Sequence, residues 1–207
     1  MNLSPKWIWF LKYLGVFFTI PIIGTLAHEL GHYLVATIYQ QPAGIAYAYT
    51  YLIGYNILTP EQWFWFIMGG PISTWTVAVL SICIILWRYR PMHSELSKSI
   101  GLGQSIASVG ASFSLRFIFN AGMYFIFTTL LGNSSGADEV DIAKIAGISP
   151  ELTMYGSAII ALMLILFTLY YLPRHQRYII LFAGFLGGIL GYISWYYWVG
   201  PIVLPYP

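Results

Sequence analysis

Five long apolar stretches separated by short polar segments dominate the sequence, at about 7–39, 62–87, 100–131, 152–172 and 178–199. A helix that crosses a bilayer needs about 20 apolar residues, and each stretch meets that length. The pattern predicts an all-α polytopic membrane protein with about five transmembrane helices. We expect the whole chain, 1–207, to form a single transmembrane domain. The first stretch is longer than a bilayer requires, and Pro21 predicts a kink within it.

The segment 40–59, between the first two stretches, is too polar for a transmembrane helix. It contains Pro42, Gly44 and Gly54 and is rich in Tyr, Ile and Thr. Residues 43–53 are expected to form a short hairpin at the membrane interface. The alternative is an irregular interfacial loop whose tyrosines anchor at headgroup level.

Charged residues are scarce, which bounds the class of protein. Only 8% of the residues are Asp, Glu, Lys or Arg, and 58% are hydrophobic, whereas an ordinary soluble domain carries about 25% charged residues. Nine basic and seven acidic residues are too few to cover a soluble globule, and disorder requires the opposite composition. Lipid is therefore the expected partner of most of the surface. The net charge of +2 is too small to indicate nucleic-acid binding.

Most of the basic residues fall in alternate loops. These are Lys6 and Lys12, then Arg88, Arg90 and Lys98, then Arg174 and Arg177. Under the positive-inside rule, this distribution predicts a multi-pass protein with a cytoplasmic N-terminus. The far end of the first helix then lies near the non-cytoplasmic face.

The first apolar stretch contains the motif His28-Glu29-Leu30-Gly31-His32. Histidines four positions apart on a helix share one face, so both imidazoles can bind one Zn²⁺ ion. Glu29 would lie beside a zinc-bound water and act as general base and then as general acid. Ionisable groups at membrane depth are rare and mostly functional. The alternative is a polar cluster satisfied within the helix bundle.

A third metal ligand is expected from the acidic segment after the third stretch, which emerges on the same side of the membrane as His28. We favour Asp138, then Asp141, then Glu139 as that ligand. The alternative for Asp138 is the N-cap of a short helix over 139–146. The two remaining histidines are expected in loops on the opposite side: His93 and His175.

The second apolar stretch carries Gly69-Gly70-Pro71-Ile72-Ser73-Thr74. Gly-Gly-Pro is expected to break the helix and free backbone groups, which at membrane depth is tolerated where a cavity is lined. Those groups, with Ser73 or Thr74, are candidates to hold a substrate strand or an oxyanion. The alternative is a simple kink with helix packing.

Two further polar residues lie within the third stretch. Arg116 and Asn120 are four apart, on one helix face, and a buried arginine requires a partner. Arg116 is expected to orient the acidic segment or stabilise an oxyanion, and a structural hydrogen bond to carbonyls is the alternative.

The fifth stretch carries glycines at Gly-x-x-x-Gly spacing, including Gly184 and Gly188. Such spacing lets another helix approach closely. We expect packing inside the bundle, with a homo-oligomer face as the alternative.

The two motifs in the first half of the chain, at 28–32 and 69–74, resemble those of the site-2 protease family of intramembrane zinc metalloproteases. The resemblance implies a zinc site on transmembrane helices, with an Asp-Gly motif on a third helix supplying the last ligand. This chain has no Asp-Gly dipeptide, and Asp138-Glu139 takes its place. Thr74 stands where the family usually has Asn. The loop charges place the site near the non-cytoplasmic face, whereas the family usually holds it nearer the cytosol. The resemblance is thus to a divergent member.

These observations predict an intramembrane zinc metallopeptidase that hydrolyses peptide bonds in membrane-embedded or membrane-adjacent proteins and peptides. Two alternatives remain. One is a membrane zinc hydrolase acting on another amide or on a lipid-linked substrate. The other is a non-catalytic metal-binding membrane protein.

Overall fold

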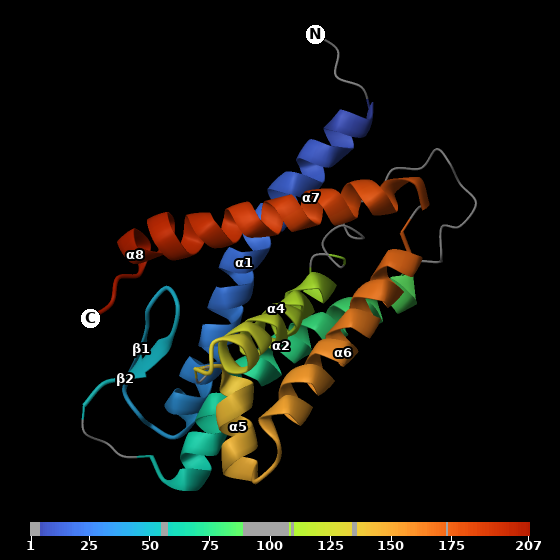
Figure 1. Ribbon diagram of the computed structural model, residues 1–207. Coiled ribbons are helices and arrows are strands. Elements are labelled where there is room, and N and C mark those ends of the chain that lie inside the picture. The colour runs from blue at the N-terminus through green and yellow to red at the C-terminus, as the bar shows by residue number, and fades with distance from the viewer. Residues whose placement is uncertain (1–4, 55–57, 89–107, 109, 134–135, 173) are drawn as a thin grey trace.

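Helix α1 (Pro5–Ile38) is the element around which the rest of the fold is assembled. It packs along α2 (Pro60–Arg88) and is crossed by α7 (Arg174–Ile193), as Figure 1 shows. This computed structural model describes residues 5–54, 58–88, 108, 110–133, 136–172 and 174–207. Two of the basic residues expected in loops, Arg90 and Lys98, lie outside the described residues, as does His93.

Shorter elements complete the chain. They are β1 (Ala43–Ile45), β2 (Thr50–Leu52), the 3₁₀ turn η1 (Ser112–Ser114), α4 (Leu115–Tyr124), the π-helical η2 (Phe125–Leu130), α5 (Asp138–Ala146), α6 (Pro150–Tyr170), the π-helical η3 (Ser194–Val199) and α8 (Gly200–Val203). The predicted helical class is confirmed.

Within the described residues, five helical segments are long and apolar enough to cross a membrane. These segments are Lys6–Ile38, Pro60–Trp87, Ser112–Leu130, Pro150–Tyr170 and Gln176–Val203. They correspond to the five predicted stretches, except that residues 100–107 of the third stretch lie outside the described residues.

The third apolar stretch is not one regular α-helix, because η1 and η2 flank α4. Two serine hydroxyls donate to backbone carbonyls of the preceding turn. Ser112 Oγ donates to the Ser108 carbonyl at 2.7 Å, and Ser114 Oγ to the Ala111 carbonyl at 2.8 Å. Bonds of this kind compete with the regular ladder and bend helices, which explains the 3₁₀ turn at this point.

Strands β1 and β2 form the predicted hairpin. They pair antiparallel with Ala43 opposite Leu52 and Ile45 opposite Thr50. The C-terminal segment fixes the hairpin, because Trp195 Nε1 donates to the Tyr47 carbonyl at 2.8 Å and the Tyr47 amide donates to a carbonyl of Leu204 at 3.0 Å.

Glycines bring the helix axes close at two crossings. Gly31 of α1 meets Gly69 of α2 so closely that a Cβ on Gly69 would lie 2.5 Å from the Gly31 carbonyl oxygen. Gly184 of α7 lies against the ring of Phe17 in α1, whereas a Cβ on Gly188 would meet nothing within 4 Å. Gly184 and Gly188 therefore do not form one outward-facing stripe, and Gly184 serves packing inside the bundle.

Candidate metal centre

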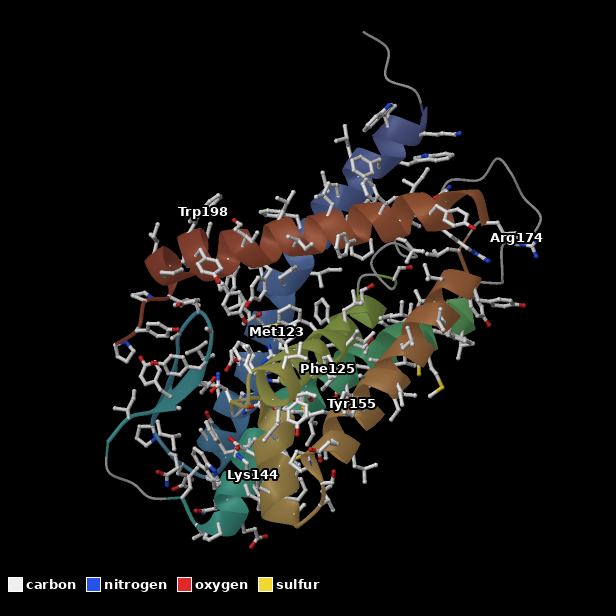
Figure 2. The ribbon with its side chains drawn as sticks, viewed as in Figure 1. Met123, Phe125, Lys144, Tyr155, Arg174 and Trp198 are labelled. Carbon is white, nitrogen blue, oxygen red and sulfur yellow. The ribbon has the colours of Figure 1, made fainter. Side chains whose placement is uncertain are left out.

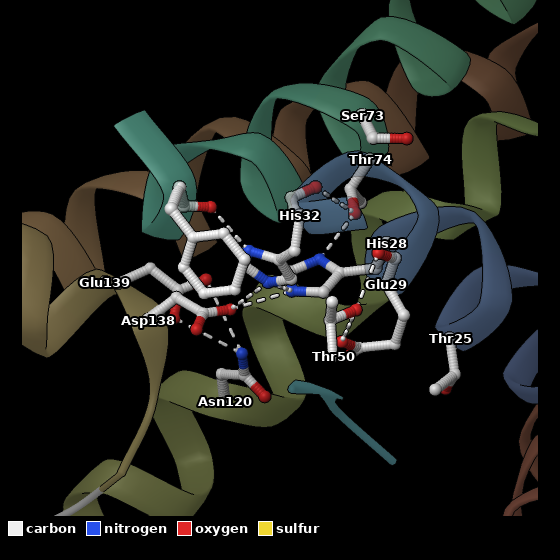
Figure 3. Close-up of polar contacts among 12 residues, drawn as sticks. Thr25, His28, Glu29, His32, Thr50, Ser73, Thr74, Asn120, Asp138 and Glu139 are labelled. Atoms are coloured by element: carbon white, nitrogen blue, oxygen red, sulfur yellow. Dashed lines mark hydrogen bonds and ion pairs between the residues drawn. The ribbon is translucent and has the colours of Figure 1, made fainter. Parts of the chain in front are cut away.

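The two histidines of α1 point their outer ring nitrogens at one spot between α1, α2 and α5 (Figure 3). His28 Nε2 and His32 Nε2 lie 3.2 Å apart, and both side chains are buried. The spacing of four residues on a continuous helix produces this convergence, as the sequence predicts.

Asp138, the first residue of α5, joins the two histidines. Its Oδ2 lies 2.7 Å from His28 Nε2 and 3.5 Å from His32 Nε2. The helix begins after Ala137, which has extended backbone and no side-chain cap. The N-cap interpretation of Asp138 is therefore wrong.

The other ring nitrogen of each histidine is also engaged. His32 Nδ1 lies 2.7 Å from the carbonyl of Phe66, to which only a protonated Nδ1 can donate. His28 Nδ1 lies 3.0 Å from Thr74 Oγ1, and the Thr74 hydroxyl is directed to the carbonyl of Gly70 at 3.2 Å. With its single proton used in this way, Thr74 accepts from His28 Nδ1.

This hydrogen-bond pattern favours a cation-binding arrangement of the three side chains. A neutral imidazole protonated on Nδ1 has a lone pair on Nε2, so His28 and His32 both present acceptors, and the Asp138 carboxylate presents a third. Three acceptors within 3.5 Å of one another repel unless a cation lies between them. Two imidazole nitrogens and one carboxylate oxygen form a common ligand set of catalytic zinc.

The distances also suit a metal. Tetrahedral zinc with ligands at about 2.0–2.1 Å has neighbouring ligand atoms about 3.3–3.4 Å apart. Two of the three observed separations, 3.2 Å and 3.5 Å, are close to that ligand–ligand distance. The third, between His28 Nε2 and Asp138 Oδ2, is 2.7 Å and would widen by about half an ångström on metal binding.

Glu29 lies beside this group without being part of its tightest contacts. Its carboxylate, His28 and His32 each offer one ligand atom within 4.8 Å of the others. The side chain is 3% exposed, and Thr50 Oγ1 of the hairpin lies 3.2 Å from Glu29 Oε2 and 2.8 Å from the Glu29 carbonyl oxygen. The hairpin therefore holds the residue that the motif nominates as general base.

The two other acidic candidates lie elsewhere. Asp141 pairs with Lys144 Nζ at 3.0 Å. Glu139 is buried, which raises its pKa, and accepts from Asn120 Nδ2 at 3.3 Å. Neither carboxylate has a contact of this kind with either histidine in the described part of the chain, whereas Asp138 Oδ2 lies within 3.5 Å of both.

The segment 69–74 does not break its helix, and that prediction is wrong. Helix α2 is continuous from Pro60 to Arg88 with Pro71 inside it. Gly70 leaves room for the metal centre, because a Cβ there would collide with both imidazoles, lying 2.7 Å from His28 Cδ2. Ser73 Oγ donates to the Ala27 carbonyl at 2.7 Å, which joins α2 to α1.

A cavity of about 570 Å³ opens beside Glu29, His32 and Asp138. Its walls come from α1, the hairpin, the start of α2, α4 with η2, and the segment leading into α5. Arg116 and Asn120 line it, as expected of substrate-facing residues. Gly70, Pro71, Ser73 and Thr74, the other substrate or oxyanion candidates, are not part of the lining.

Arg116 and Asn120 make different contacts in the structure. Asn120, rather than Arg116, contacts the acidic segment, through Glu139 (Figure 3). The buried Nε of Arg116 has no hydrogen-bond partner among the described residues. The alternative, a structural hydrogen bond from Arg116 to backbone carbonyls, is therefore not found for this nitrogen.

Sequence reasoning missed two contributors to the site and gave a third, Gly70, a different role. Thr50 gives no signal beyond its place in the predicted hairpin. The Phe66 carbonyl gives none, because backbone atoms carry no sequence signature. Gly70 is part of a motif interpreted as a helix break, although its role is to leave space.

Comparison with known proteins adds no further constraint. No protein-family model matches the chain, and neither a curated protein nor a solved structure matches it.

Proposed function

We propose that the protein is an intramembrane zinc metallopeptidase that hydrolyses peptide bonds in membrane-embedded or membrane-adjacent substrates. The observation that carries this proposal is the convergence of three acceptor atoms, from His28, His32 and Asp138, beside Glu29 at the edge of a cavity. The resemblance of segments 28–32 and 69–74 to the site-2 protease family points to the same activity.

His28, His32 and Asp138 would hold the metal, while Thr74 and the Phe66 carbonyl fix the orientation of the two imidazoles. Zinc bound there would polarise a substrate carbonyl and lower the pKa of a bound water to about 7.

Glu29 would take a proton from the attacking water and return it to the leaving nitrogen. The amide C–N bond breaks, the carbonyl carbon gains hydroxyl, and the nitrogen leaves as an amine. The Thr50 hydroxyl, shared between the Glu29 carbonyl and Oε2, would help to keep the carboxylate in place for both transfers. Burial of Glu29 excludes competing bulk water.

The five long apolar helices support the membrane setting of this proposal. Most of their large side chains face outward, including Leu34, Ile38 and Leu86, and a lipid environment would cover them. His28 and His32 lie within the first of these helices. The loop charges favour a cytoplasmic N-terminus and a site nearer the other face.

A substrate helix must unwind to reach the site. One turn of helix about 10 Å wide and 5.4 Å long fills about 420 Å³, so the 570 Å³ cavity admits little more than one turn. The cleaved segment would therefore enter as a few extended residues with its carbonyl exposed.

The test uses the full chain purified in detergent or nanodiscs. Glu29→Gln should retain zinc, measured by plasma mass spectrometry, and lose cleavage of quenched fluorescent peptides and of a reconstituted transmembrane peptide. Glu61→Gln, which changes an exposed acid at the start of α2, should retain both properties.

Other outcomes would contradict the proposed mechanism or favour a different function. Cleavage that persists in the Glu29→Gln protein would refute the proposed mechanism. A full equivalent of zinc with no peptide cleavage would favour hydrolysis of a lipid-linked substrate or another amide. A purified protein that binds no zinc or similar divalent metal would favour the non-catalytic alternative.

A further inference from the structure

Arg116 is the one basic side chain among the described residues that line the cavity. The same lining contains three carboxylates, from Glu29, Asp138 and Asp141. None of these three has an ion pair with Arg116 in the described part of the chain: Asp138 pairs with the histidines and Asp141 with Lys144. The guanidinium is therefore a positive group in the cavity that the surrounding acids do not neutralise by direct contact.

The hydrogen bonding of Arg116 also indicates that the guanidinium is available to a ligand. Its Nε is buried without a partner among the described residues. An unsatisfied buried donor on a charged group is costly, and proteins retain such groups mainly at functional sites. Asn120, one turn further along α4, is already used by Glu139, so Arg116 is the donor that remains for a ligand.

The wall that carries Arg116 is one face of a helix. Its lining residues are spaced by three, one, three and four positions, which places them on a single face. They are Arg116, Phe119, Asn120, Met123 and Phe127. In Figure 2, the labelled Met123 lies in the middle of the molecule, between the ends occupied by Lys144 and Arg174. A ligand on this wall meets a cation at one end and, apart from Asn120, apolar side chains along the rest.

A carboxylate fits this wall better than a phosphate does. The planar guanidinium matches a carboxylate through two parallel hydrogen bonds. A dianionic phosphate carries about twice the charge of a carboxylate, so Glu29, Asp138 and Asp141 in the lining would repel it about twice as strongly. The apolar remainder of the wall suits a hydrophobic residue attached to that carboxylate.

We propose that Arg116 binds the terminal carboxylate of a peptide whose last residue is apolar. The site would then act near the C-terminal end of its substrate, and this assignment rests on the proposed peptidase function. The small cavity, which holds little more than one helical turn, fits a chain end better than a chain that continues in both directions.

The test compares three N-acetylated tetrapeptides ending in phenylalanine: a free acid, the matching amide, and an amide with an internal glutamate. Binding to the zinc-loaded Glu29→Gln protein is measured by calorimetry, and cleavage by the unaltered protein by mass spectrometry. The free acid should bind about 10- to 100-fold more tightly than the amide, as expected for charge-assisted hydrogen bonds.

Variants test whether Arg116 is the residue responsible for tighter binding of the free acid. Arg116→Gln in the same background should abolish it, and Arg116→Lys should keep part of it, because lysine retains the charge without the planar fork. Arg174→Gln is the matched control, since Arg174 is exposed at the start of α7, far from the cavity (Figure 2). Each variant is first checked for zinc content and a single size-exclusion peak.

The outcomes separate this inference from the peptidase proposal. Equal binding of acid and amide, no binding of either at millimolar concentration, or a preference that survives Arg116→Gln overturns the inference. Binding of the internal glutamate peptide as tightly as the free acid overturns the terminal assignment. Binding that depends on Arg116 without any cleavage supports the carboxylate site and overturns the peptidase. If the free acid and the amide are cleaved equally and Glu29→Gln abolishes cleavage of both, the peptidase proposal is supported and the carboxylate site is overturned.

Discussion

Replacing Gly70 with alanine should abolish metal binding, although it changes none of the proposed ligand residues. A Cβ at this position would lie closer than 3.0 Å to both histidines, a separation that real Cβ atoms do not reach, and its nearest neighbours are the two Nε2 atoms. Zinc needs those same atoms at about 2.0–2.1 Å. The methyl group and the ion would therefore compete for one space.

The size of the effect follows from how little the surroundings can move. Gly70 belongs to the continuous helix α2, whose approach to α1 is fixed one residue away by the contact of Gly69 with Gly31. Loss of a residue that only orients a ligand weakens metal binding about 10- to 100-fold. Filling the metal position should exceed that range.

The assay is zinc content and zinc affinity of the purified full chain, by plasma mass spectrometry and competition with a chromophoric chelator. Gly188→Ala is the matched control, because a Cβ there meets nothing within 4 Å, and it should bind one equivalent of zinc. Circular dichroism should show equal helix content in both variants. A Gly70→Ala protein that is folded and binds zinc as tightly as the unaltered chain would refute the placement of the metal between these atoms.

Three further predictions follow from individual contacts. Thr74→Val removes the partner of His28 Nδ1 and should weaken zinc affinity about 10- to 100-fold in the chelator assay; unchanged affinity would contradict the orienting role. Thr50→Val removes the hydroxyl beside Glu29 and should lower kcat about tenfold with zinc content unchanged; a loss of zinc instead would show that Thr50 supports the metal rather than the base. Gly191→Ala places a methyl group against a backbone carbonyl of α1 and should lower the free energy of unfolding by about 1–3 kcal/mol, measured by thermal or denaturant unfolding, whereas the Gly188→Ala control should be close to neutral; equal stability of the two variants would refute the close α1–α7 crossing.

Much of the architecture is local and can be predicted from the order of residues. Apolar length alone anticipates the helices, including α6 from Pro150 to Tyr170, which the sequence places at 152–172. Composition anticipates the hairpin, because segment 40–59 contains both turn residues and β-formers. The irregular third stretch is not anticipated, since serine back-bonding leaves the apolar pattern unchanged.

The candidate site likewise contains residues that the sequence alone can pair and residues that it cannot. His28 and His32 can be paired from sequence because four residues on a helix bring them to one face. Asp138 is 110 positions from His28, and the sequence only narrows the third partner to a short acidic segment. Asp138, Glu139 and Asp141 leave one helical turn in different directions, and the docking of α5 against α2 selects the first of them.

The order of residues is enough to predict a helical, apolar chain with a dense group of ionisable residues on its first helix. Both properties depend on neighbours within one or two turns, where periodicity acts. Helix packing supplies the residues that complete that group. Helix crossings at glycine brought Thr74 and the Phe66 carbonyl to the imidazoles, the hairpin brought Thr50 to Glu29, and α4 brought Arg116 to the cavity wall. These contacts depend on the depth and rotation with which helices pack, and no local pattern in the chain encodes either quantity.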